Sequence, residues 1–174
     1  CSKVCCTHSL KTALALKALN PATRVYILYR EIRSYGFRED LYKEARSNGV
    51  IFIRFEPENG PEVTVDADNT LGVTVMDHVL NMKVRIRPDY LVLASAILPN
   101  ANQELFEMFK VPVNSDGFLV EAHAKLRPVD FSSDGLFVAG LAHYPKPLEE
   151  SIAQAKAAVA RAMTIIAKDS IMVG

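Results

Sequence analysis

The sequence predicts an α/β fold that combines a buried parallel sheet with an antiparallel β-meander. Helical and strand-like patterns alternate between residues 7 and 55 with short links, which is typical of parallel strands joined by crossover helices. Three segments then alternate apolar with polar residues, which predicts consecutive antiparallel strands. An alanine-rich helical pattern near the end predicts a long closing helix.

The first predicted helix covers residues 7–19. Leu10, Leu14 and Ala18 share one face at helical spacing, and Thr7 can cap the start of the helix. The other elements follow from the same periodicities and from Gly and Pro punctuation. In order, we expect a strand over 24–30, a helix over 37–48, a strand over 50–55, antiparallel strands over 62–66, 71–78 and 81–87, a buried strand over 90–94, a short helix over 103–110, strands over 118–121 and 136–139, and a helix over 148–167.

The composition excludes several classes of protein. Twenty basic and twenty acidic residues give a formal net charge of zero, so a basic face for nucleic acid is not expected. The apolar runs are too short to span a membrane, and no signal peptide opens the sequence. Since the first residue is a cysteine, we expect the chain to be a piece of a longer protein or a processed product.

The three cysteines form the first candidate site. Cys1, Cys5 and Cys6 have no later cysteine to pair with, which indicates a reducing, cytoplasmic compartment rather than a disulfide framework. A helix start favours thiolates, and thiolates bind iron–sulfur clusters or zinc. The C-x3-C-C spacing differs from that of a zinc ribbon. Metal or cluster binding and inert buried thiols therefore both remain open.

A glycine turn before the closing helix is the second candidate site. A predicted strand ends at Gly140, and the helix begins near Pro147. Glycine lets the backbone approach a ligand, and the positive end of the helix can stabilise negative charge. The alternative is an ordinary strand-to-helix turn. A third and weaker candidate is the basic segment 29–33 at the end of a strand, where a phosphate could bind. No glycine-rich phosphate loop is present, which argues against a complete nucleotide site.

These motifs resemble the A subunit of heterodisulfide reductase and its relatives. The resemblance rests on Cys1-Ser-x-x-Cys5-Cys6, on residues 29–33 and 121–130, and on residues 140–146 followed by 150–155. It implies an oxidoreductase component, namely a thioredoxin-reductase-type flavoprotein with iron–sulfur clusters, which passes electrons among flavin, clusters and other subunits in anaerobic metabolism. The expected partners are the other subunits of such a complex, and exposed sheet edges could also promote a homodimer.

The resemblance also implies a partial FAD/NAD(P)-binding Rossmann-like fold with three layers. Residues 1–96 would be an inserted NAD-binding-like domain without its first strand, and residues 97–174 would be the C-terminal segment of the FAD-binding domain. Because cysteines stand where related reductases carry a glycine-rich loop, we expect no NAD site.

The same resemblance implies the site residues. Cys1, Cys5 and Cys6 would ligate an iron–sulfur cluster, and FAD would lie near Gly140, Leu141, Ala142, His143 and Lys146. Leu141 stands where the flavoprotein pattern has aspartate, so one carboxylate contact to FAD would be lost. We expect no catalytic residue in this chain, and weak or no FAD binding by the chain alone. The alternative function is a non-catalytic scaffold with inert cysteines.

Overall fold

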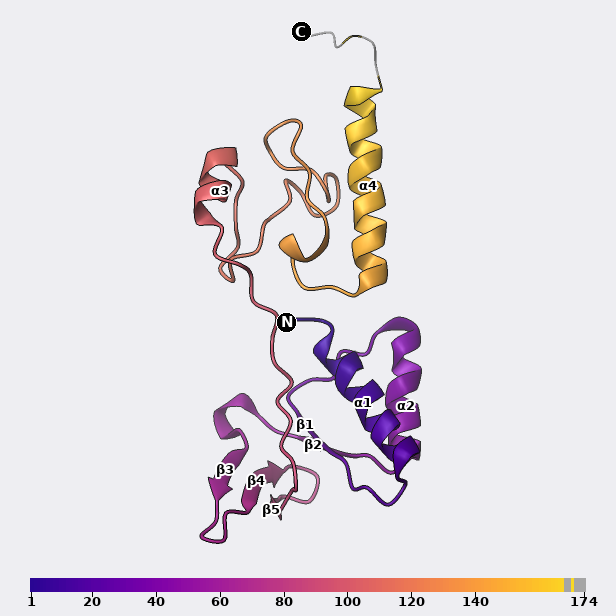
Figure 1. The fold of residues 1–174 in the computed structure, drawn as a ribbon, viewed down its shortest axis with the longest axis vertical. Helices are drawn as coiled ribbons and strands as arrows, with labels where there is room; N and C mark the ends of the chain where they lie inside the picture. The colour runs from indigo at the N-terminus through magenta and orange to yellow at the C-terminus, as the bar shows by residue number, and fades with distance from the viewer. Residues whose placement is uncertain (168–169, 171–174) are drawn as a thin grey trace. The chain divides into compact units, whose positions relative to one another are not determined.

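The computed structural model describes residues 1–167 and 170 as a mixed α/β chain (Figure 1). The chain divides into two compact units. One unit is Cys5–Ser95, and the other combines Cys1–Val4 with Ala96–Gly174. Among the described residues, no helix is both long enough and apolar enough to cross a membrane.

The unit Cys5–Ser95 begins with the predicted alternation of helices and strands. Helix α1 (Cys5–Leu19) leads to strand β1 (Tyr26–Tyr29), and helix α2 (Glu39–Ser47) leads to strand β2 (Ile51–Arg54). The two strands pair in parallel, with Ile27 opposite Phe52. A short 3₁₀ turn precedes α2, and Gly49 follows it in the left-handed conformation that ends helices.

Apolar side chains from both helices form the core of this unit. Leu10 and Ala13 of α1 meet Ala45 of α2 and Val50, and each is at most 5% exposed. The half-buried residues that pack around them come from both helices, from β1 and the residue before it, and from β2, and are Leu14, Val25, Ile27, Leu41, Tyr42 and Phe52. Burial of these side chains from water is the main term that holds the helices on the strands.

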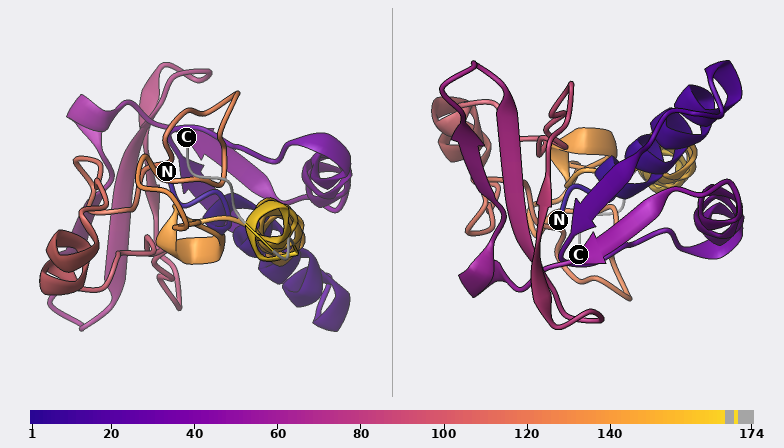
Figure 2. Two further views of the ribbon diagram at one scale, coloured as in Figure 1. Left: turned by 90° about the horizontal axis from the view of Figure 1, so that it is seen from above. Right: turned by 90° about the horizontal axis from the view of Figure 1, so that it is seen from below.

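The antiparallel meander is present as predicted. Strands β3 (Glu62–Val65), β4 (Leu71–Asp77) and β5 (Met82–Ile86) pair in chain order. On the central strand Val73 and Val75 are buried, which matches the alternation in the sequence. In the right-hand view of Figure 2, β1 and β2 lie between the two helices and this sheet.

The second unit has little regular sheet. It contains helix α3 (Gln103–Phe109), a 3₁₀ turn η3 (Gly140–Ala142) and helix α4 (Leu148–Ile166). Its buried apolar residues come from the loops between the helices and are Phe118, Val129, Phe131 and Val138. Asp130 is also buried there, and Arg161 of α4 donates hydrogen bonds to both of its carboxylate oxygens at 3.1 and 3.3 Å.

Several predicted features are wrong. Residues 90–94 form no strand, and Tyr90, Val92 and Leu93 are each more than three-quarters exposed. A buried strand needs paired neighbours, and the described part of the chain places none beside this segment. Residues 118–121 and 136–139 make only isolated bridges. Thr7 does not cap α1, because the helix already begins at Cys5 and the Thr7 hydroxyl has no hydrogen-bond partner among the described residues.

Candidate functional site

The loop from Gly140 to α4 is the best-defined polar site in the described structure. Gly140 has a φ of 72°, in the left-handed region that glycine adopts without steric cost. A Cβ built on Gly140 would meet no atom within 4 Å. The need for glycine here therefore comes from the backbone conformation and not from a lack of space.

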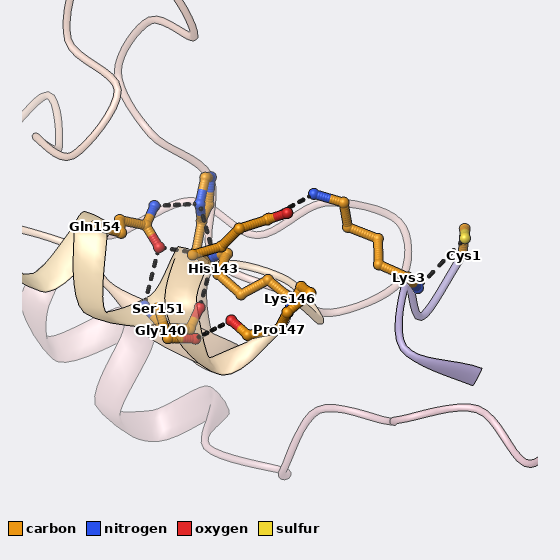
Figure 3. Close-up of polar contacts among 9 residues, drawn as sticks. Cys1, Lys3, Gly140, His143, Lys146, Pro147, Ser151 and Gln154 are labelled. Carbon is orange, nitrogen blue, oxygen red and sulfur yellow. Dashed lines mark hydrogen bonds and ion pairs between the residues drawn. The ribbon is translucent and has the colours of Figure 1, made fainter. Parts of the chain in front are cut away.

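The side chain of Gln154, on the second turn of α4, closes this loop (Figure 3). Its Oε1 accepts hydrogen bonds from the Gly140 amide at 2.9 Å and from the Lys146 ammonium at 2.7 Å. Its Nε2 lies 2.6 Å from His143 Nδ1. Lys146 also donates to the Gly140 carbonyl at 2.8 Å. One amide group thus connects both ends of the turn to the helix.

The contacts of His143 indicate which of its ring nitrogens accepts a hydrogen bond and which donates one. Nδ1 faces two donors, the Gln154 amide and the Lys146 ammonium at 3.3 Å, so it must accept. Nε2 lies 2.6 Å from Glu121 Oε2 and therefore carries the proton in the neutral ring. Burial raises the pKa of Glu121, but the hydrogen bond with His143 and nearby charges outweigh it and leave the pKa below its usual value.

Lys146 is a buried cation at the centre of the site. It is 5% exposed, and its three donor directions are taken by Gly140, Gln154 and His143. Burial and then the positive charge of Lys3 lower the pKa of Lys146 to about 8, although Glu150 and Glu121 act in the opposite direction. Its Nζ also lies 4.0 Å from the centre of the Tyr144 ring.

The predicted flavin-binding residues fall into two groups. Leu141, half exposed, and Ala142 form the 3₁₀ turn after Gly140, while His143 and Lys146 are buried and held by internal hydrogen bonds. An open cavity of about 390 Å³ lies beside them. It is lined by Glu121, Ala124, Pro128, Val129, His143, Tyr144, Lys146, Glu150, Ala153 and Gln154.

The three cysteines are all free thiols. Cys5 and Cys6 open α1, and the Cys6 thiol contacts the Glu31 carbonyl at 3.8 Å. Burial raises the pKa of the Cys6 thiol above 9.0 and Cys5 adds to the rise, while the Arg33 backbone and charge oppose it. Within the part of the chain that the structure describes, no three His, Cys, Asp or Glu side chains are grouped to hold a metal.

Cys1 belongs to the other unit, together with the Gly140 loop. Its sulfur accepts a hydrogen bond from the Lys3 amide at 3.4 Å, and the Lys3 ammonium lies 2.8 Å from Glu150 on the first turn of α4. The third predicted candidate, residues 29–33, ends in an exposed ion pair between Arg33 and Glu31. That ion pair partly neutralises the charge expected to bind phosphate.

Sequence reasoning did not identify the polar partners of the loop. Glu121 and Gln154 stand out only as parts of the longer motifs 121–130 and 150–155, without a role. Both side chains form hydrogen bonds with the His143 ring. Glu121 stands 22 residues before His143 in the sequence, and Gln154 stands 11 residues after it. The sequence feature that could have pointed to these partners was a carboxylate and an amide side chain in the segments on either side of the glycine turn.

Comparison with protein-family models gives no match. Curated relatives match along almost the whole chain. The chain is 38% identical over 95% of its length to the A subunit of the ferredoxin:CoB-CoM heterodisulfide reductase of Methanosarcina acetivorans, and 36% identical over 98% to the A subunit of the H(2):CoB-CoM heterodisulfide,ferredoxin reductase of Methanothermobacter thermautotrophicus. It is 39% identical over 91% of its length to the iron-sulfur A subunit of the CoB--CoM heterodisulfide reductase of Methanocaldococcus jannaschii. The chain spans 20%, 26% and 24% of the lengths of these relatives.

Proposed function

Because this chain is homologous to a segment of heterodisulfide reductase A subunits, we propose that it is an electron-transfer segment of a flavin and iron–sulfur oxidoreductase. The observation that carries the proposal is the extent of the similarity. A match over 98% of the chain leaves out only a few residues and spans the Gly140–Lys146 loop. The other subunits of a heterodisulfide-reductase-like complex are the proposed partners.

The Gly140–Lys146 loop is the proposed contact with FAD, which would supply reversible one- and two-electron chemistry when bound. The loop suits an anionic cofactor, because the backbone turn at Gly140 is open and Lys146 carries a buried positive charge. Leu141 and Ala142 would contact FAD through their backbone, and Gly140, whose amide and carbonyl already bond to Gln154 and Lys146, would contact it through its Cα, which faces open space. His143 and Lys146 would act by holding the turn, since their polar atoms are already hydrogen-bonded within the protein.

FAD is larger than the cavity of about 390 Å³ beside the loop, so this chain would form only one wall of its site. The exposed apolar side chains of α4, Ile152, Val159 and Met163, support the same interpretation. We propose that residues 97–174 are the C-terminal segment of a Rossmann-like FAD domain and that residues 1–96 are an inserted NAD-binding-like domain that has lost its NAD site. Weak or absent FAD binding by the isolated chain follows.

The three cysteines are the proposed contribution of this chain to an iron–sulfur cluster. Thiols are the donor type that such clusters require, and all three are free. The described residues nevertheless group no three metal-binding side chains. Three thiols are one fewer than a four-ligand cluster requires, so a cluster that used them would need a further ligand.

One observation favours the scaffold function as an alternative. Burial raises the pKa of the Cys6 thiol, so without a bound metal that group is protonated and weakly reactive at neutral pH. In a scaffold the domain would only dock other subunits, and its cysteines would be inert. The two functions differ in whether the protein carries iron.

The deciding experiment is anaerobic purification of the full-length protein, with measurement of iron, sulfide and flavin. Electron transfer predicts cluster absorption that dithionite bleaches, with part of the iron lost in a variant in which Cys1, Cys5 and Cys6 are all serine. Unchanged iron content in that variant would refute cluster ligation by these residues. The matched control replaces Ser9 of α1 with alanine and is expected to retain all iron.

The isolated chain gives a second test. After incubation with iron, sulfide and FAD and then desalting, we expect no stoichiometric flavin. Isothermal titration that gave tight one-to-one FAD binding would contradict the assignment of residues 97–174 as a partial FAD domain. A chain that also stayed free of iron would favour the scaffold function for this segment.

A further inference from the structure

Lys3 lies between the first cysteine and the loop proposed to bind flavin. Its ammonium is 2.8 Å from Glu150 on the first turn of α4 and 5.1 Å from the centre of the Tyr144 ring. Both side chains of the ion pair are about 30% exposed, so water screens the pair only partly. A single side chain therefore links residues 1–4 to the segment that follows Gly140.

The backbone around Lys3 is unusual. Lys3 has a φ of 56°, which non-glycine residues rarely adopt, and the Val4 amide donates to the Ser2 carbonyl at 2.6 Å across it. A three-residue turn closed in this way, with a positive φ at its central residue, is a γ-turn of the rare and strained class. Strain of this kind persists only where surrounding contacts outweigh it. The contacts of Lys3 with Glu150 and with the Tyr144 ring are among those that can do so.

The turn also orients Cys1 and Ser2. It directs the Lys3 amide to the Cys1 sulfur at 3.4 Å. The buried Ser2 hydroxyl accepts a hydrogen bond from the Ile97 amide at 2.9 Å. Ser2 and Lys3 thus anchor the segment at two points, of which the Lys3 contact is the one that reaches the region after Gly140.

We infer that Lys3 is a positioning residue that holds residues 1–4, and with them the Cys1 thiol, in one position relative to α4 through its ion pair with Glu150. The inference rests on the proposed function, because it gives a purpose to a link between a proposed cluster ligand and the helix that follows the proposed flavin loop. Lys3 itself would touch neither group. Its role is to hold a strained turn in place, so that Cys1 occupies one position relative to α4.

Amide hydrogen exchange of the 174-residue chain tests this inference without any cofactor. The reporters are the Val4 and Ile97 amides, each hydrogen-bonded to Ser2. Lys3→Met should increase their exchange rates roughly fivefold through loss of a partly buried ion pair. Glu150→Gln should do the same, and the double variant should exchange no faster than either single variant. Lys3→Arg, which keeps the charge, should restore slow exchange.

The control is Lys43→Met, which removes an exposed ion pair with Asp40 on α2 and should leave both reporters unchanged. The amide of Val138, which is buried in the same unit and donates to the Val129 carbonyl, reports whether each variant remains folded. Unchanged exchange in Lys3→Met, or failure of Lys3→Arg to restore it, would overturn the inference. If the reporters respond but the full-length protein contains no flavin, only the proposed function fails. If that protein contains flavin and the reporters do not respond, only this inference fails.

Discussion

The amide of Gln154 and the ring of His143 are locked together at 2.6 Å, in an arrangement that permits one tautomer of the histidine. The Oε1 of Gln154 already accepts from Gly140 and Lys146, so its Nε2 must donate to Nδ1. The Nε2 proton of His143 is then directed at Glu121. A chain of hydrogen bonds thus runs from Gln154 of α4 through the His143 ring to Glu121.

Replacement of Gln154 with leucine should destabilise the protein strongly. The Gly140 amide and His143 Nδ1 would each lose a partner in a half-buried site, and Lys146 would lose one acceptor. Buried polar groups without partners cost about 1–3 kcal/mol each, so we expect a loss of about 2–4 kcal/mol in the free energy of unfolding in urea. Lys156→Ala, an exposed change on the same helix, should cost less than about 0.5 kcal/mol. Equal effects of the two variants would show that the Gln154 contacts do not stabilise the loop.

Gly140→Ala should be costly because of its backbone alone. At a φ of 72°, a Cβ adds about 1–2 kcal/mol of strain, although it would meet no neighbouring atom. The matched control is Gly60→Ala, where the space is equally open but φ is −61°. That change should be neutral or slightly stabilising. Thermal unfolding of the two variants side by side measures the difference, and matching midpoints would contradict a strained Gly140.

The free energy of unfolding should depend on pH in a way that the lowered pKa of Lys146 predicts. Its pKa is lowered from 10.5 to about 8, so between these values the unfolded chain binds more protons than the folded chain. The contribution of Lys146 to stability should therefore rise as the pH increases from 8 to 10.5. Lys146→Met should lack this rise. The measurement is the urea midpoint of each protein at about pH 7.5 and about pH 10. Subtracting the change in the variant from the change in the wild-type protein removes the contribution of the other titrating groups. Equal changes in the two proteins would contradict a lowered pKa of Lys146.

Cys5 should control the reactivity of Cys6. Burial first, and then the neighbouring Cys5, raise the pKa of the Cys6 thiol. Cys5→Ser should lower that pKa, so alkylation of Cys6 by iodoacetamide should become faster at about pH 8. Mass spectrometry of the peptide that contains Cys6 measures the rate, and Ser9→Ala on the same helix serves as the control. An unchanged rate would mean that burial alone sets the reactivity of Cys6.

The first half of the fold was largely readable from local pattern. The structure contains the helix predicted from Leu10 and Leu14 and the strand predicted from Val73 and Val75. Such predictions succeed because an element that buries one face has apolar residues at the repeat of a helix or of a strand. Residues 90–94 show the limit of such reasoning. Their apolar run reads as a buried strand, yet a run of this kind does not specify whether a partner strand is available beside it.

The sequence by itself determined the similarity to heterodisulfide reductase A subunits, through motifs that include the three cysteines and the turn at Gly140. It also determined the order of the helices and strands from α1 to β5. Only the tertiary structure decided that Gln154 and Glu121 hold His143, and that Lys3 meets Glu150 across 147 positions of sequence. Hydrogen bonds and ion pairs depend on distance in space, and a single sequence contains no measure of distance between segments that fold together from far apart.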